Sequence, residues 1–179
     1  TRTTMMSTTT ADLDFLPPDT TGIAEPACLA AAVQMQRVTV PVSPTVSVTG
    51  TVGISYIHWP AANTKTKQNF PPLILTHGFD SSGLEYRRLG PKLQQLGIEC
   101  YAVDLLGWGY TQLVQQEQEQ EPISYSAAAK IEALQSFVDN FVLGGANNNK
   151  RNNKKYCVAG ASLGGAAAIE LAAAATTTN

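Results

Sequence analysis

The sequence feature that most constrains this chain is the segment 156–165, which has the sequence Tyr-Cys-Val-Ala-Gly-Ala-Ser-Leu-Gly-Gly. A short apolar run ends there in Gly-x-Ser-x-Gly, and an alanine-rich segment follows over 166–175. This order predicts a strand, a sharp turn and a helix, with the hydroxyl of Ser162 at the apex of the turn. Gly160 and Gly164 fit this prediction, because a strand and a helix that approach so closely leave room for only the smallest residues.

The predicted turn gives Ser162 a distinctive chemical setting. A serine in such a turn has a strained backbone conformation that only its surroundings can maintain. Its hydroxyl also lies at a helix N-terminus, where free N–H groups and the helix dipole favour developing negative charge. An ordinary glycine-rich turn could carry the same motif, but the strand before it and the helix after it favour a nucleophile.

Four further strands are expected before this turn. Alternating apolar and polar residues predict strands over 36–42 and 48–59, and Pro41 indicates an edge position for the first. A continuous apolar run over 73–76 predicts a strand that is buried on both faces of a parallel sheet. The run 98–103 predicts the next strand.

Helices are expected between these strands. The capping-box sequence at 82–85 predicts the start of one helix, which Pro91 restarts or kinks and Gly97 ends. Ser124 or Ser126 caps a second helix, whose apolar residues recur at helical spacing. Strands that alternate with helices predict an α/β fold with a mostly parallel sheet flanked by helices.

Chemically useful residues follow three of the predicted strands. The segment 77–79 (His-Gly-Phe), Asp104 and Ser162 all come at strand ends. Functional sites of parallel α/β sheets lie at the carboxyl ends of the strands, so we expect the site there. His58 lies inside a predicted strand without an evident partner, and we expect it to be a packed strand residue rather than a catalyst.

Three separated motifs resemble the N-terminal half of α/β-hydrolases. They are Leu-Thr-His-Gly-Phe at 75–79, Asp-Leu-Leu-Gly-Trp-Gly at 104–109 and Gly-Ala-Ser-Leu-Gly-Gly at 160–165. Their order and spacing match the family over residues 36–175. The first two motifs are similar to a plant and algal branch of the AB hydrolase-1 type. The resemblance implies an α/β-hydrolase sheet that is truncated after the helix that follows Ser162.

The resemblance also implies a role for each motif residue. Ser162 would be the nucleophile, and the backbone N–H groups of Phe79 and Leu163 would form an oxyanion hole. His77 and Gly78 would support the loop that carries Phe79, rather than supply the catalytic base.

Four further residues have structural roles by the same resemblance. Asp104 would tie down its own loop, and Gly160 and Gly164 would form the nucleophile turn. Trp108 lies between two glycines where many relatives have Gly-His-Gly, and this stretch would form the same turn.

The catalytic partners of Ser162 are missing from the sequence. In this fold an acid and then a histidine follow the serine. After Ser162 the chain has no histidine and no aspartate, and Glu170 would lie about 12 Å along a helix, too far to orient a base. We therefore expect a piece of a longer hydrolase that is inactive alone, with a flexible leader over 1–35, a partial core over 36–175 and a polar tail over 176–179.

Composition excludes several classes of partner. A net charge of −2 without a clustered basic face argues against a nucleic-acid partner, and no apolar run reaches the roughly 20 residues of a membrane span. Cys28, Cys100 and Cys157 lack metal-ligand spacing, so we expect reduced core thiols and no metal. Reduced thiols indicate an intracellular reducing compartment, either a plastid or the cytoplasm.

The expected function is a cofactor-free serine hydrolase that acts on a small-molecule ester, thioester or related acyl bond. A non-catalytic, hydrolase-like binding protein is the alternative, because the catalytic partners are missing. Epoxide hydrolases and dehalogenases of this fold have an aspartate at the nucleophile position, so Ser162 argues against them. A cofactor-free haloperoxidase or a C–C hydrolase stays open, and the sequence defines neither the substrate nor the oligomeric state.

Overall fold

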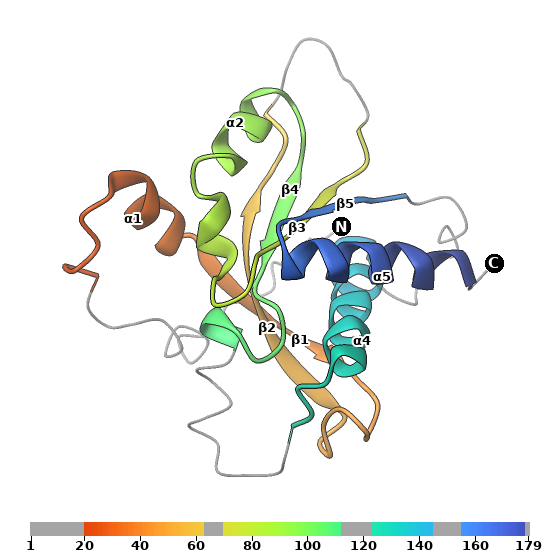
Figure 1. Ribbon diagram of the computed structural model, residues 1–179. Coiled ribbons are helices and arrows are strands. Elements are labelled where there is room, and N and C mark those ends of the chain that lie inside the picture. Colours follow the sequence, from red (N-terminus) through yellow and green to blue (C-terminus); the bar gives the residue numbers. More distant parts are fainter. Residues whose placement is uncertain (1–19, 63–69, 112–122, 145–154, 178–179) are drawn as a thin grey trace, which may run out of the picture.

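A five-stranded sheet between two helical layers forms the centre of the molecule (Figure 1). The computed structural model describes residues 20–62, 70–111, 123–144 and 155–177. The strands are β1 (Met35–Pro41), β2 (Thr51–Trp59), β3 (Leu73–Thr76), β4 (Cys100–Val103) and β5 (Cys157–Gly160). Their order across the sheet is β1-β2-β4-β3-β5.

The helical elements lie on both faces of this sheet. They are α1 (Pro26–Ala32), the 3-10 helix η2 (Gly83–Tyr86), α2 (Gly90–Gln95), α4 (Ala127–Phe137), the π-helical segment η3 (Val138–Val142) and α5 (Leu163–Thr177). Helices α4 and α5 cover one face, and α1, η2 and α2 cover the other. The helix-flanked α/β sheet expected from the sequence is therefore present.

The sheet is mixed rather than wholly parallel. Strands β3, β4 and β5 run parallel, whereas β2 pairs antiparallel with β4 and with β1. Pro41 ends β1 at the sheet edge, where its missing N–H interrupts no interior ladder. The carboxyl ends of the parallel strands β3, β4 and β5 lie at the same end of the sheet. The three sequence motifs follow these strands and therefore lie close together.

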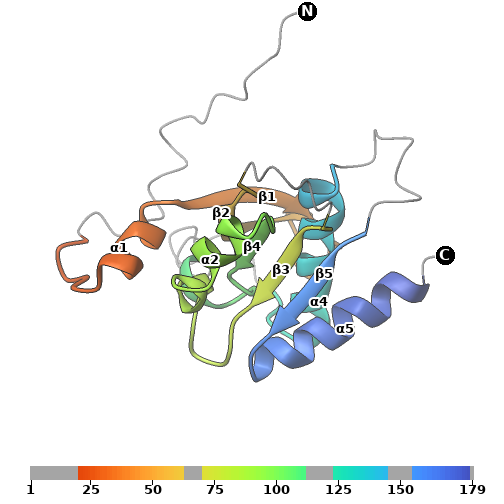
Figure 2. The same ribbon diagram turned by 90° about the horizontal axis from the view of Figure 1, so that it is seen from above.

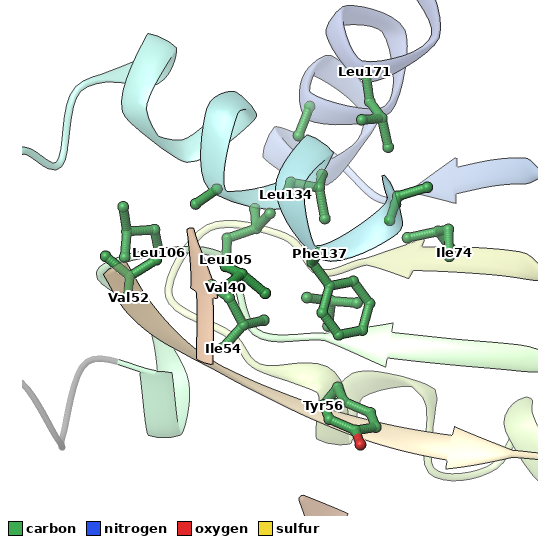
Figure 3. Close-up of a cluster of buried hydrophobic side chains, with 14 of the residues drawn as sticks. Val40, Val52, Ile54, Tyr56, Ile74, Leu105, Leu106, Leu134, Phe137 and Leu171 are labelled. Atoms are coloured by element: carbon green, nitrogen blue, oxygen red, sulfur yellow. The ribbon is translucent and has the colours of Figure 1, made fainter. Parts of the chain in front are cut away.

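Two hydrophobic cores lie on opposite faces of the sheet, as the period of two in the strands requires. Ile74 belongs to the core under α4 and α5, whereas its neighbour Leu75 belongs to the core under α2. Figure 3 shows side chains of the first core converging from β1, β2 and β3 and from α4 and α5. Phe137 is fully buried at its centre, with its ring centroid 5.3 Å from that of Tyr56.

Part of the predicted leader is ordered. Residues 26–35, which the sequence placed in a flexible leader, form α1 and the start of β1, and Ala31 and Met35 are buried in the second core. Glu25 accepts hydrogen bonds of 2.7 Å from both Arg87 and Arg88. Apolar burial and this ion pair thus fix a segment that has no clear sequence period. Residues 1–19 of the leader lie outside the described residues, and at the other end α5 extends through Thr177 into the predicted tail.

The helix predicted from the capping box is shorter than expected. The Ser82 hydroxyl accepts the N–H of Leu84, but the element that follows is a 3-10 helix of four residues. A separate helix begins at Gly90, with Pro91 in its first turn. A side chain at position 90 would overlap the ring of Trp59, so the close packing of α2 on β2 needs glycine there.

The three cysteines are free thiols, but only one of them is a core residue. Cys100 is fully buried in β4, and burial raises the pKa of its thiol to about 12. Cys28 is half-buried and Cys157 is exposed on β5, which contrasts with the expectation of core thiols. Strand β5 borders only β3 among the described residues, which explains its exposure. Those residues contain no group of side chains suited to a metal ion and no helix able to cross a membrane.

Replacement of Phe137 with alanine should destabilise the chain strongly. The substitution leaves a cavity among the rings of Tyr56, Tyr101 and Phe141, and such truncations cost about 3–5 kcal/mol. Urea unfolding followed by circular dichroism measures the change. Ile169, which is 72% exposed on α5, provides the control, because Ile169→Ala should change the unfolding free energy by less than about 0.5 kcal/mol. Equal losses in the two variants would contradict this core assignment.

Candidate active site

Ser162 lies in the sharp turn that connects β5 to α5. Its φ angle is 51°, in the left-handed region that non-glycine residues rarely adopt, and its side chain is exposed. Helix α5 begins at the next residue and has 15 residues, so the Ser162 hydroxyl stands at the positive end of a long helix dipole. Figure 2 shows this turn beside the loop that leaves β3.

Gly160 and Gly164 allow this turn to close. A Cβ atom on Gly160 would come closer than 3.0 Å to the carbonyl oxygen of Gly164. A Cβ atom on Gly164 would overlap the carbonyl oxygen of Thr76 in the same way. The start of α5 therefore lies in direct backbone contact with the ends of β3 and β5, and any side chain at either glycine would separate them.

Thr76 fastens the same junction through hydrogen bonds. Its buried hydroxyl donates to the carbonyl of Gly164 at 2.8 Å, and its own carbonyl accepts the N–H of Ala161 at 3.2 Å and the hydroxyl of Tyr86 at 2.8 Å. This role was not predicted from the sequence. The only available signal was a polar residue at the end of an otherwise apolar strand.

The loop after β3 packs directly against Ser162. A Cβ atom on Gly78 would lie 3.5 Å from the carbonyl oxygen of Ala161 and 3.8 Å from the Cβ atom of Ser162. Phe79 follows immediately, and Asp80 turns the loop with a φ angle of 54°. The segments that carry the N–H groups of Phe79 and Leu163 thus meet at the serine.

Glu85 holds this loop from the side. Its Oε2 atom accepts the N–H of Gly78 at 2.9 Å. In a capping box the acidic residue bonds back to the start of its own helix, whereas Glu85 bonds to the loop after β3. A carboxylate that extends to a different loop has no sequence signal, so its partner became visible only in the structure.

His77 is fully buried and uses both ring nitrogens. Its Nε2 atom accepts the N–H of Leu105 at 3.1 Å, so its Nδ1 atom carries the proton and donates to the carbonyl of Gly78 at 2.8 Å. These two bonds define a neutral tautomer that links the loops after β3 and β4. With both nitrogens occupied, this imidazole has no free position to accept a proton from Ser162.

Asp104 organises the loop after β4. Its two carboxyl oxygens accept the N–H groups of Gly83 at 2.6 Å and Tyr110 at 2.8 Å. Burial raises the pKa of this carboxyl, and the two N–H bonds partly oppose that rise. A Cβ atom on Gly109, whose φ angle is 55°, would lie 2.5 Å from the carboxyl, so glycine is required there. This geometry agrees with the loop-tying role that the resemblance implies.

The other histidine and the one acid that follows Ser162 in the sequence do not face the serine. His58 pairs with Glu99 at 2.9 Å and stacks on Tyr101, with 4.2 Å between the ring centroids. Tyr101 is near the start of β4, so this cluster lies toward the amino ends of the parallel strands, whereas Ser162 lies at their carboxyl ends. Glu170 is exposed on α5, eight residues beyond the serine.

An aromatic pair at the site was also missed by sequence reasoning. The rings of Phe79 and Trp108 meet edge to face, with 4.8 Å between their centroids. The two residues belong to different motifs, and the Phe79 side chain is 71% exposed.

Comparisons with known proteins identify relatives for much of this chain. The profile of the family described as "Serine aminopeptidase, S33" matches residues 68–178. The Alpha/beta hydrolase domain-containing protein VTE7 of Arabidopsis thaliana is 38% identical over 99 residues, which are 55% of this chain and 28% of that protein.

Two solved structures share the fold at low sequence identity. An epoxide hydrolase variant from Vigna radiata has a TM-score of 0.51 at 16% identity, over 79% of this chain and 35% of that one. The haloalkane dehalogenase DbeA from Bradyrhizobium elkani has a TM-score of 0.51 at 19% identity, over 78% and 38%. The chain thus spans less than two fifths of the length of these relatives.

Alanine substitutions at two neighbouring glycines of α5 should distinguish the effect of the close backbone contact on stability from the general effect of alanine in a helix. Gly164→Ala should destabilise the chain by about 1–3 kcal/mol or more, because the new methyl group overlaps the carbonyl oxygen of Thr76. In Gly165→Ala the nearest atom is 3.4 Å away, so the unfolding free energy should stay within about 1 kcal/mol of wild type. Chemical unfolding measures both, and a tolerated alanine at 164 would refute the described turn.

Proposed function

Because this chain belongs to the α/β-hydrolase family whose profile is described as serine aminopeptidase S33, we propose that the intact protein is a serine hydrolase with Ser162 as nucleophile. Its substrate is a small molecule with an ester, thioester or related acyl bond. No cofactor is needed for this chemistry, because a serine, a base and an oxyanion hole are sufficient.

The single observation that carries the proposal is the strained, exposed position of Ser162 against Gly78. A left-handed φ at a non-glycine residue needs a structural reason, and functional sites are where such strain accumulates. The glycine loop next to it leads directly to the N–H of Phe79, and α5 begins with the N–H of Leu163. Each feature on its own is common, whereas their convergence supports a nucleophile.

In the proposed reaction the Ser162 oxygen attacks the acyl carbon, and the carbonyl oxygen becomes an oxyanion. The N–H groups of Phe79 and Leu163 would donate to that oxyanion, and the helix dipole of α5 adds to its stabilisation. The loss of one such donor in a serine protease costs roughly 3 kcal/mol of transition-state stabilisation. Collapse of the tetrahedral intermediate would break the bond from the acyl carbon to the alcohol or thiol, which leaves with the proton that the base took from Ser162. The resulting acyl ester of Ser162 would then be hydrolysed by water, which releases the carboxylic acid and restores the serine.

The hydroxyl needs a base, and neither histidine of this chain is suited to that role. His77 already uses both nitrogens, and His58 lies at the opposite sheet edge. The proposal therefore assigns the catalytic acid and histidine to residues of the intact protein beyond position 179. A chain of 179 residues would then be inactive by itself.

The identity of residue 162 selects among hydrolases of this fold. The epoxide hydrolase and the haloalkane dehalogenase share only the fold with this chain. Members of those two classes carry an aspartate at the turn, whereas this chain carries a serine. A serine supports acyl transfer through a covalent ester.

Labelling with a fluorophosphonate probe tests the nucleophile. The intact protein should be labelled at Ser162, as peptide mass spectrometry would show, because the probe reacts only with an activated serine. Ser162→Ala should abolish the label, and the heat-denatured protein and the 179-residue chain should remain unlabelled. An intact, folded protein that never reacts would favour the non-catalytic binding protein instead.

Substitution of Glu85 tests the support of the oxyanion loop. Glu85→Ala removes the acceptor of the Gly78 N–H, and kcat should fall by about tenfold with little change in KM, since loss of a whole donor costs about 100-fold or more. Glu85→Gln keeps an acceptor oxygen and should recover most of the activity. Equal activity of the alanine variant and the wild type would show that Glu85 does not position this loop.

A further inference from the structure

Beside Ser162 the chain presents an aromatic surface that the proposed reaction does not use. Phe79 and Trp108 form an edge-to-face pair, with the Phe79 side chain 71% exposed. The backbone of Phe79 carries one proposed oxyanion donor, so its ring starts within a few bonds of the reacting centre. An apolar group attached to the acyl carbon would meet this pair.

Packing and a backbone hydrogen bond hold Trp108 in place. Trp108 packs in part against the first hydrophobic core, which lies under α4 and α5. Its backbone N–H donates to the carbonyl of Leu105 at 2.9 Å in a tight turn. A Cβ atom on Gly107 would lie 2.7 Å from the ring of Tyr125, so the turn is packed closely on that side as well. The indole is therefore a fixed part of the fold rather than a free surface side chain.

His77 connects the two loops that carry Phe79 and Trp108. The loop with Phe79 bonds to the Nδ1 atom of this imidazole through Gly78, and the loop with Trp108 bonds to its Nε2 atom through Leu105. Both rings thus take their position from one buried group that also holds the oxyanion loop. A single exposed aromatic residue is ordinary on a protein surface, but two residues from separate motifs, locked together at the nucleophile, are not.

We infer that Phe79 and Trp108 form an apolar subsite for the hydrocarbon part of the substrate, and that Trp108 favours acyl esters with longer alkyl chains over acetyl esters. This inference rests on the proposed function. Burial of each additional methylene against the two rings favours binding, so selectivity should increase with chain length. A polar or charged acyl group would gain nothing from this surface.

Chain-length selectivity of the intact protein tests the subsite. The measured quantity is kcat/KM for p-nitrophenyl octanoate divided by that for p-nitrophenyl acetate. Trp108→Ala should lower this ratio by about tenfold, chiefly through a higher KM for octanoate, which is the scale of one hydrophobic pocket contact. Trp108→Phe should restore most of it.

Two further variants keep the result interpretable. Trp108→His keeps a smaller ring in the turn and should lower the ratio even where the alanine variant folds poorly. Phe70→Ala removes a side chain that is 49% exposed before β3, at the opposite sheet edge, and should leave the ratio unchanged. An unchanged ratio in both the alanine and the histidine variant, with acetate still hydrolysed, would overturn the subsite.

A binding measurement distinguishes failure of the subsite from failure of the proposed function. Sodium octanoate should change the tryptophan emission of the wild type saturably, sodium acetate should not, and Phe79→Ala should weaken the octanoate response. Octanoate binding without ester hydrolysis would retain the subsite and refute the hydrolase. No response to octanoate, with a fluorophosphonate-reactive Ser162, would retain the hydrolase and refute the subsite.

Discussion

The backbone contact between Gly164 and the carbonyl of Thr76 is the constraint on which the rest of the site depends. Because no side chain separates them, α5 can begin directly beside the ends of β3 and β5. This closeness forces Ser162 into a left-handed conformation and leaves its hydroxyl exposed.

The buried polar residues at the carboxyl ends of the strands hold loops and the start of α5 in place. His77 joins two loops, Asp104 holds two backbone N–H groups, and Thr76 holds the first turn of α5. Each is buried and hydrogen-bonded, as polar groups in protein interiors must be. The hydroxyl of Ser162 and the ring of Phe79 are instead exposed, so a small molecule in solvent can reach them. Under the proposed function, His77 and Asp104 therefore hold loops in place and do not react.

The strands, the turn at Ser162 and the meeting of the three motifs at the carboxyl ends of the strands were predictable from the sequence, because each is encoded in a local pattern. Alternation in β2, glycine spacing around Ser162 and motif positions at strand ends are all readable within a few residues. The bond from Glu85 to Gly78 and the pairing of Phe79 with Trp108 were not predictable, because side-chain partners between loops have no periodic signal. Helix α1 was missed for the same reason, since its order comes from burial and from ion pairs with a distant segment.

A crystal structure of the intact protein with a phosphonate bound covalently to Ser162 would show which groups bind the oxyanion. The account predicts that the phosphonyl oxygen accepts hydrogen bonds from the N–H groups of Phe79 and Leu163, each at about 2.7–3.1 Å. The same structure should show the serine still in its left-handed conformation. A phosphonyl oxygen that points into solvent, or that is bound by groups outside these two loops, would contradict the account.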